Sequence, residues 1–376
     1  MPKNMVRIIF TFLCLLPSIL YAQDGFDSLV DAAKRGDVKV QVMLGDMYLN
    51  GNQIQKDYAE ALRWYLRSDE KGSIEGQCNI GYMYAKGLGV KHDNFEAIKW
   101  YRKSADKGFP RCECNMGDMY ENGNGTNQDY DLALKWYRKA ADHNYDYGYL
   151  NVGRMYEEGH SVQKDLAEAV RWYLKAAALN NLIAEGKLGW AYEHGLGVEV
   201  DSEESVKWYT KSAEAGDIIS QNNLGRMYTH GWGKNGPDYT EAVKWFMKAA
   251  RAGNALSLYI LGQIYENGAG EIKQDYKEAA HCYEHAAEKG HANSQYRLGL
   301  LLDGGKGVAQ NDSSAVKWYT KAFEQGNVNA MGRLGIMYYE GRGVEKDRAK
   351  ALQYIRTARD RGYREFENYL KSHGEL

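Results

Sequence analysis

Apolar and small residues follow a helical spacing that repeats along almost the whole chain. The first segment of each repeat holds an apolar residue followed by a glycine, here called the pair glycine. Further apolar or small residues stand five before, one before, and two and three after it. At about 100° per residue these positions share one side of a helix, which predicts an amphipathic helix. The pair glycines are spaced by 36 residues, or twice by 37, at Gly45, Gly81, Gly117, Gly153, Gly189, Gly225, Gly262, Gly299 and Gly335.

A second segment in each repeat carries a large aromatic residue nineteen or twenty positions after the pair glycine. Seven of the nine copies have Trp there, and Cys282 and Tyr354 replace it in the other two. Each segment opens with Asp or Asn, and six copies have Glu three residues later, which is typical of a helix N-terminus. Each ends at Gly, or at Asn144 or Asn180, residues that accept a left-handed helix end. The opening residues are Asp57, Asp93, Asp129, Asp165, Asp201, Asp238, Asp275, Asn311 and Asp347.

These two segments predict nine helix-turn-helix repeats over residues 37–362, in an all-α chain. Such short repeats bury their core against neighbours, which favours one elongated array over separate domains. Residues 23–36 and 363–376 are expected to cap its two ends. Most of the 41 glycines fall at fixed places in the repeat. A glycine inside a helix costs about 1 kcal/mol relative to alanine, so we expect each pair glycine to make room for the ring at the Trp position.

Residues 1–22 differ in character from the repeats. Lys3 and Arg7 precede an apolar run over 8–20, and a small residue, Ala22, follows it, which predicts a cleaved export signal. An uncleaved anchor is the alternative, although Pro17 interrupts a run shorter than the roughly 20 residues that span a bilayer. Cleavage leaves 46 basic and 50 acidic residues, a net charge of −4 and no remaining membrane span. This balance gives no support for nucleic-acid binding.

The repeated pattern LG-x-MY-x-x-G-x-GV-x-x-D-x-x-x-A-x-x-WY-x-KAA-x-x-G resembles the Sel-one-like repeat family, which is related to tetratricopeptide repeats. The resemblance implies a right-handed α/α superhelical solenoid whose first helices line the concave side. It also implies a non-enzymatic scaffold that binds a protein or peptide. Exported bacterial members are associated with secretion, host contact and envelope processes. A periplasmic or secreted location is therefore expected, with an envelope-adaptor, host-interaction or toxin-neutralising role.

Three positions of the first helix vary among the repeats and lie opposite its packed side. They stand three before, one after and four after the pair glycine. Several hold large apolar or aromatic residues, among them Leu300 and Ile336, which are costly in bare solvent and are favoured at interfaces. An unconstrained solvated face would vary too. The residues expected to bind the partner are Tyr82, Asp118, Glu121, Tyr149, Arg154, Glu157, Trp190, Glu193, Arg226, Trp232, Tyr259 and Tyr296.

The middle of the array is expected to bind most strongly. Trp190 lies on the variable side, and Trp232 lies in a glycine-flanked turn, where it contacts a partner or covers a hairpin end. Glu121, Glu157 and Glu193 recur once per repeat. Because packed helices stand about 10 Å apart, this spacing is too wide for one metal ion and suits an extended or basic partner. We expect the mature chain to be a monomer.

Signals for catalysis or cofactor binding are weak. His281 and His285 have a metal-ligand spacing but replace outward-facing lysines of other repeats, so neither a metal nor a cofactor is predicted. Ser68 and Ser104 each stand three residues before a lysine, as in penicillin-recognising enzymes, but occupy the position of packed alanines. Weak penicillin-binding or hydrolase activity in the envelope is the alternative function. Labelling by a fluorescent penicillin would distinguish the two.

The cysteines leave a choice of pairing. Cys78, Cys112 and Cys114 lie in neighbouring repeats, whereas Cys282 lies far away in the sequence. A disulfide from Cys78 to either Cys112 or Cys114 requires Cα atoms within about 7 Å of each other. The chain lacks the paired cysteine in every repeat that marks the cysteine-rich subgroup of the resembling family, which has been linked with penicillin binding.

Overall fold

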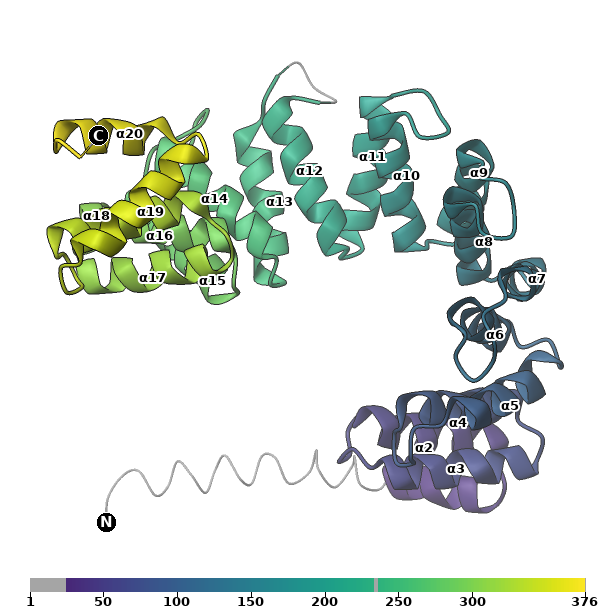
Figure 1. Ribbon diagram of the computed structural model, residues 1–376. Coiled ribbons are helices and arrows are strands. Elements are labelled where there is room, and N and C mark those ends of the chain that lie inside the picture. The colour runs from purple at the N-terminus through teal and green to yellow at the C-terminus, as the bar shows by residue number, and fades with distance from the viewer. Residues whose placement is uncertain (1–24, 233–235, 376) are drawn as a thin grey trace, which may run out of the picture. The chain divides into compact units, whose positions relative to one another are not determined.

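The computed structural model describes residues 25–232 and 236–375, and these residues are helical throughout apart from short connections. No strand occurs among them, although Ala269 and Ile272 form an isolated antiparallel bridge. The expected export signal over residues 1–22 lies outside the described residues. A helix over residues 25–34 precedes the first repeat. Figure 1 shows the helices that follow, in pairs joined by short turns.

The helices alternate between the two predicted types. The first helices are α2 (Val38–Asn50), α4 (Ile74–Lys86), α6 (Pro110–Asn122), α8 (Asp146–Glu158), α10 (Leu182–His194), α12 (Ile218–His230), α14 (Ala255–Asn267), α16 (Ala292–Gly304) and α18 (Val328–Glu340). The second helices are α3 (Tyr58–Glu70), α5 (Asn94–Ala105), α7 (Tyr130–Asp142), α9 (Leu166–Ala178), α11 (Ser202–Glu214), α13 (Tyr239–Arg251), α15 (Tyr276–Glu288), α17 (Asp312–Glu324) and α19 (Arg348–Asp360). The last helix is α20 (Arg364–Ser372).

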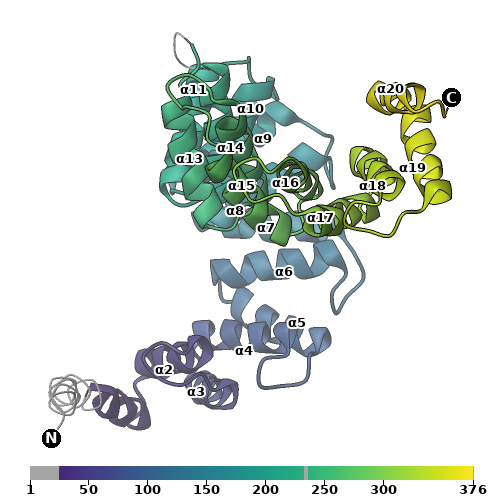
Figure 2. The same ribbon diagram turned by 90° about the vertical axis from the view of Figure 1, so that its left-hand side faces the viewer.

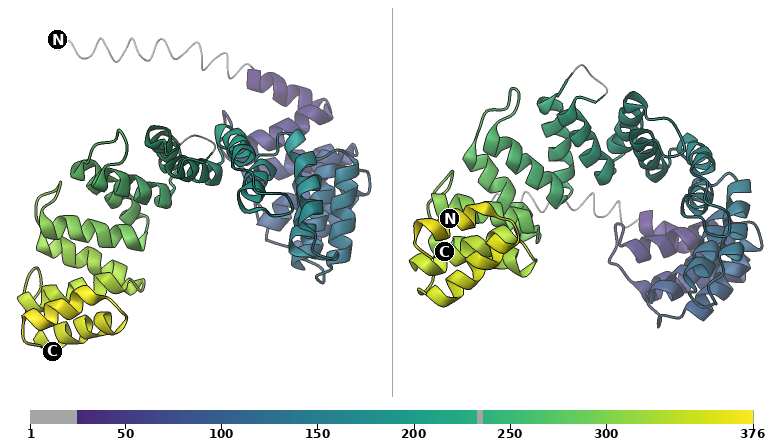
Figure 3. Two further views of the ribbon diagram at one scale, coloured as in Figure 1. Left: turned by 90° about the horizontal axis from the view of Figure 1, so that it is seen from above. Right: turned by 45° about the horizontal axis from the view of Figure 1, so that its top comes forward.

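The chain divides into two compact units, with the boundary between Ala184 and Glu185 inside α10. Within each unit, the first helices pack against the second helices of their own repeats, and neighbouring repeats lie side by side (Figures 2 and 3). For α10, which crosses the boundary, the packing is seen where Gly189 meets Tyr209 of α11. Each unit is therefore an α solenoid, as the repeat pattern predicts.

The polar residues that open the second helices act as predicted. All nine are N-caps whose side chains accept hydrogen bonds from backbone N–H groups of the first turn. Asp129, for example, accepts from the Leu132 N–H at 2.9 Å. At the other end, Asn144 and Asn180 adopt the left-handed conformation, with φ of 56° and 61°. These local contacts explain why each helix begins and ends where the sequence indicates.

Eight of the nine pair glycines make room for a ring, and Gly335 for Ile355, but the ring is that of the residue after the predicted Trp position. A Cβ atom added to Gly117 would lie 2.3 Å from Tyr137, the residue after Trp136, and Gly45 faces Tyr65 at the same distance. The rings of Tyr65 and Tyr137 are fully buried. Trp64, Trp136 and Trp245 are buried and the other four Trp residues are half-buried. Each Trp ring is covered by a basic side chain three residues later, such as Lys139 above Trp136 at 3.8 Å.

The C-terminal end of the array is covered by α20. Phe366 and Leu370 of this helix are buried in a cluster with Met331, Ile336 and Ile355. Ile336 is one of the apolar residues expected on the variable side of the first helices. Its burial corrects that expectation, because α20 covers it.

Candidate partner-binding surface

The acidic residues on the variable side of the first helices accept hydrogen bonds from buried tyrosines of their own repeats. The Tyr137 hydroxyl donates to Glu121 at 2.6 Å, and the Tyr209 hydroxyl donates to Glu193 at 3.0 Å. Tyr173 likewise donates to Glu157 at 2.6 Å. The tyrosine that needs the glycine for space therefore also anchors a carboxylate one turn further along the first helix.

Arginines of the following repeat complete this arrangement at several places. Arg154 donates to both carboxylate oxygens of Glu121, and Arg226 pairs with Glu193. Burial by itself raises the pKa of Glu121, but the hydrogen bonds from Arg154 and Tyr137 outweigh it and hold that pKa below its ordinary value. The equivalent acids of later repeats also pair with arginines, although from other positions: Glu266 with Arg297 and Asp303 with Arg342.

These contacts change the expected role of the acidic series. Glu121 and Glu193 are each only 8% exposed, and their carboxylates pair with arginines of the following repeat. They are not open acceptors for a basic partner, in contrast to the expectation from sequence. Asp118 also accepts from Tyr137, at 2.7 Å, and keeps an exposed surface. Glu157 is half-buried.

The same cluster offers the one group of possible metal ligands among the described residues. Ligand atoms of Glu121, Glu158 and His160 lie within 4.8 Å of one another. Arg154, however, already pairs with Glu121 and lies 3.3 Å from Glu158. A cation brought to this point would meet the guanidinium charge, so the cluster is better described as a structural ion-pair network.

Three aromatic residues predicted to bind a partner pack within their own repeats. The ring of Tyr149 lies 5.9 Å from that of Trp172. Tyr259 and Tyr296 each lie 6.0 Å from the buried tyrosine of their second helix, Tyr283 or Tyr319. All three are half-buried and expose only part of their rings to solvent.

A group of predicted residues comes together in the second unit, on α10 and α12. Trp190 is 45% exposed, and its ring lies 3.7 Å from that of His194 on the next turn. Beside it, Glu193 pairs with Arg226, whose guanidinium lies 5.6 Å from the ring of Trp232. Exposed indole surface next to a held arginine is the composition that protein interfaces favour.

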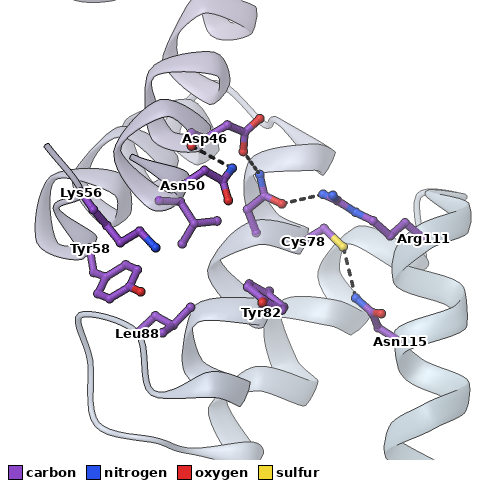
Figure 4. Close-up of a pocket in the computed structure, with 11 residues that line it drawn as sticks. Asp46, Asn50, Lys56, Tyr58, Cys78, Tyr82, Leu88, Arg111 and Asn115 are labelled. Carbon is purple, nitrogen blue, oxygen red and sulfur yellow. Dashed lines mark hydrogen bonds between the residues drawn. The ribbon is translucent and has the colours of Figure 1, made fainter. Parts of the chain in front are cut away.

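A pocket of about 610 Å³ opens in the first unit between α2, α4 and α6 (Figure 4). Tyr82, predicted to bind a partner, lines it and is 41% exposed. Of the other lining residues, Asp46, Leu49 and Cys78 stand at the variable positions of the first helices, although none was predicted to bind a partner. The rest lie outside those positions: Asn50, Lys56, Tyr58, Asn79, Leu88, Arg111 and Asn115. They come from three repeats and from turns, so no single position of the repeat identifies them.

One wall of this pocket contains a disulfide. Cys78 and Cys112 are bonded, with their Cα atoms 5.8 Å apart, and the bond joins α4 to α6. Cys114 and Cys282 are buried free thiols. Burial raises the pKa of the Cys114 thiol well above its ordinary value and that of Cys282 to about 12, so neither is activated as a nucleophile.

The serines that precede lysines are part of the packing. Ser68 is fully buried and donates to the Tyr65 carbonyl at 2.7 Å. Ser104 is also fully buried and donates to the Ile74 carbonyl at 2.6 Å. His281 and His285 lie on an exposed face of α15 with their rings 4.4 Å apart. Within the described part of the chain, no helix has the length and apolar character to cross a membrane.

Stacked helix pairs with glycine-tyrosine packing define a helical-repeat solenoid, a class of protein that presents extended surfaces for binding. The chain belongs to the Sel1 repeat family, whose members are protein-interaction scaffolds. Sel1 repeats match residues 38–73, 74–109, 110–145, 146–181, 183–217, 218–254, 255–291, 292–327 and 328–363.

Two solved structures resemble the chain over most of its length. One is c5321, a protective antigen present in uropathogenic Escherichia coli strains and displaying an SLR fold. It is 35% identical, with a TM-score of 0.66, over 88% of this chain and 78% of the other. The second is a Sel1 repeat protein from Oxalobacter formigenes, 36% identical with a TM-score of 0.59, over 66% of this chain and 99% of the other. No match was found among curated proteins.

Proposed function

We propose that this protein is an exported, non-enzymatic scaffold that binds a protein or peptide partner through the face formed by its first helices. The observation that carries the proposal is the contrast between the two sides of these helices. The packed side repeats one contact between the pair glycine and the residue after the Trp position, a tyrosine in seven of the nine repeats, whereas the variable side presents Trp190 and Tyr82 to solvent. Large exposed aromatic residues on a rigid helix are the usual anchors of protein interfaces.

A periplasmic or secreted location follows from the apolar segment over residues 8–20 with its basic start. Among an envelope adaptor, a host-interaction protein and a toxin-neutralising protein, the second is favoured. Its support is the similarity to c5321, which is described as a protective antigen of uropathogenic strains. N-terminal sequencing of the exported protein tests the location, since cleavage after Ala22 leaves Gln23 as the first residue.

The binding proposal is tested by capturing partners from envelope and culture-medium fractions and comparing variants of the full chain. Trp190→Ala is expected to weaken binding of a captured partner about 30-fold, as a central aromatic anchor does. Its melting temperature should stay close to that of the unchanged protein, because Trp190 is 45% exposed and lies outside the buried core. Phe95→Ala is the matched control: Phe95 is 70% exposed but belongs to a second helix.

Two results would contradict the proposal. One is a partner whose affinity is unchanged by Trp190→Ala and by Tyr82→Ala. The other is a loss of affinity for Phe95→Ala as large as the loss for Trp190→Ala, which would place binding on the second helices.

A further inference from the structure

The pocket between α2, α4 and α6 contains an arginine that differs from the other arginines of the first helices. Across the described residues, each of the others has a carboxylate partner within 4.0 Å, whereas Arg111 has none. The pairs are Arg154 with Glu121, Arg226 with Glu193, Arg297 with Glu266 and Arg333 with Glu365. Arg111 therefore has a positive charge that its own repeats leave uncompensated.

Arg111 is held in place by neutral groups. Its Nη2 donates to the Asn79 side-chain oxygen at 2.5 Å, and its guanidinium lies 5.3 Å from the ring of Phe109. Its Nε is buried and has no hydrogen-bond partner. Because this atom has no accessible surface, any contact of Arg111 with a ligand in the pocket is made by its Nη groups.

The acid in the pocket is already engaged. Asp46 accepts the Tyr65 hydroxyl at 2.6 Å and the Asn79 amide at 3.1 Å, so Asn79 stands between it and Arg111. Lys56, on the far side of the pocket from Arg111 in Figure 4, likewise has no carboxylate partner among the described residues. Because Arg111 and Lys56 carry two positive charges and Asp46 only one negative charge, the side chains that line the pocket have a net positive charge.

The remaining lining indicates what kind of molecule carries the complementary charge. Tyr58, Tyr82 and Asn115 provide hydroxyl and amide groups, while Leu49 and Leu88 provide apolar surface. A volume of about 610 Å³ is larger than one carboxylate side chain requires. Mixed polar and apolar walls around two separated cations suit a short peptide with acidic side chains better than a compact inorganic anion.

We propose that this pocket binds an acidic segment of the partner, with one Asp or Glu carboxylate on Arg111 and a second acidic side chain towards Lys56. The proposal rests on the scaffold function proposed above and names the chemistry of the partner. It also places a specific binding point in the first three repeats, whereas Trp190 belongs to the fifth.

The test uses a random ten-residue peptide library displayed on phage and selected on the full chain. In this format the peptides have no free C-terminus, so any carboxylate must come from a side chain. The selected peptides should be enriched in Asp and Glu over the starting library. Changing their acidic residues to Gln or Asn should weaken binding about tenfold or more, the usual effect of losing a charged hydrogen bond.

Variants of the protein then locate the site. Arg111→Gln should weaken the acidic peptides about tenfold or more, and Arg111→Lys should recover part of the affinity. Lys39→Gln is the matched control, because it removes one exposed positive charge of the first repeat outside the pocket and should leave affinity unchanged. An unchanged circular dichroism melt shows that Arg111→Gln folds. If that variant does not fold, a Tyr82→Cys variant is used instead. The same peptides should then protect the new thiol from alkylation.

The possible failures are separable. Selected peptides without acidic enrichment, or acidic peptides that bind Arg111→Gln as well as the unchanged chain, overturn the acidic pocket and leave the scaffold function standing. Acidic peptides whose affinity falls with Trp190→Ala but not with Arg111→Gln overturn the proposed location of the site. A selection that yields no peptide overturns the inference, whereas loss of Trp190-dependent partner capture would overturn the function itself.

Discussion

At the scale of single residues, the repeat depends on one contact between a glycine and a ring. Gly117 has no side chain, and Tyr137 of the second helix occupies the space that a Cβ would take. The tyrosine ring then lies against the first helix, and its hydroxyl reaches Asp118 and Glu121. The helix-destabilising effect of glycine is offset by this close packing.

Gly117→Ala is therefore expected to lower the free energy of unfolding by about 1 to 3 kcal/mol, the usual range for overpacking. Gly304→Ala is the control, because a Cβ there meets only Lys306, at 3.8 Å. Its higher helix propensity should raise stability by up to about 1 kcal/mol. Urea unfolding followed by tryptophan fluorescence measures both, and equal effects at the two positions would refute the steric explanation.

A second residue-scale prediction concerns Glu121 and pH. Because its pKa is lower in the folded protein than in the unfolded chain, its stabilising contribution is present above the unfolded pKa of about 4.3 and declines as the pH falls through the folded pKa. Glu121→Gln should lower the free energy of unfolding by roughly 2 kcal/mol at pH 7, since it breaks charged hydrogen bonds to Arg154.

The difference between Glu121→Gln and the unchanged protein should shrink as the pH is lowered below about 4. Glu158→Gln serves as the comparison, because Glu158 also contacts Arg154 but its side chain is 39% exposed. It should cost less than about 1 kcal/mol at any pH. A difference for Glu121→Gln that stays constant from pH 7 to pH 3 would show that the carboxylate is not the cause.

At the scale of helices, each junction between repeats has its own connection. Arg154 and Glu121 connect α8 to α6, whereas the Cys78–Cys112 disulfide connects α4 to α6. The pairs recur with a separation of about one repeat, so they act between neighbours. This arrangement holds the first helices in fixed register and thereby fixes the pocket that contains Arg111.

Replacing Cys78 and Cys112 together by Ala is expected to lower the free energy of unfolding by about 2 to 4 kcal/mol. The bond closes a loop with a sequence separation of 34, and cross-links of this size stabilise by restricting the unfolded chain. Dithiothreitol should lower the stability of the unchanged protein to the same level and leave the double variant unaffected. A reducing agent without effect on the unchanged protein would mean that the bond is absent in solution.

At the scale of the whole molecule, stability is expected to be local. The extensive contacts within each unit join helices that are near neighbours in the sequence. In such repeat proteins, stability is approximately the sum of repeat terms and nearest-neighbour interfaces. A change at one end should therefore have little effect several repeats away.

Removing residues 364–376 tests this expectation. The truncation uncovers Met331, Ile336 and Ile355, which pack against Phe366 and Leu370 of α20. Hydrogen exchange should accelerate in α18 and α19 and stay unchanged in α2 to α6, in agreement with local opening. Faster exchange throughout the chain would show that the repeats unfold as a single cooperative body.

The fold could be predicted from the sequence because its signals are short-range and occur nine times. Asp129 and its counterparts cap their helices through contacts with residues two or three positions away. Asn144 and Asn180 adopt the left-handed conformation for equally local reasons. The period of the pattern then determined which helices pair, because each copy needs its neighbour to cover its apolar side.

Only the tertiary structure decided which side chains meet across repeats, and this determines the candidate binding surface. The sequence alone predicts that Glu121 and Glu193 are exposed and available to a partner, and it assigns no role to Arg111. In the folded chain the two glutamates pair with arginines 33 residues away, whereas Arg111 remains without an acid beside Lys56 in the pocket. Periodicity identifies the face of a helix that a residue occupies, but the side-chain distances across an interface depend on how adjacent repeats pack.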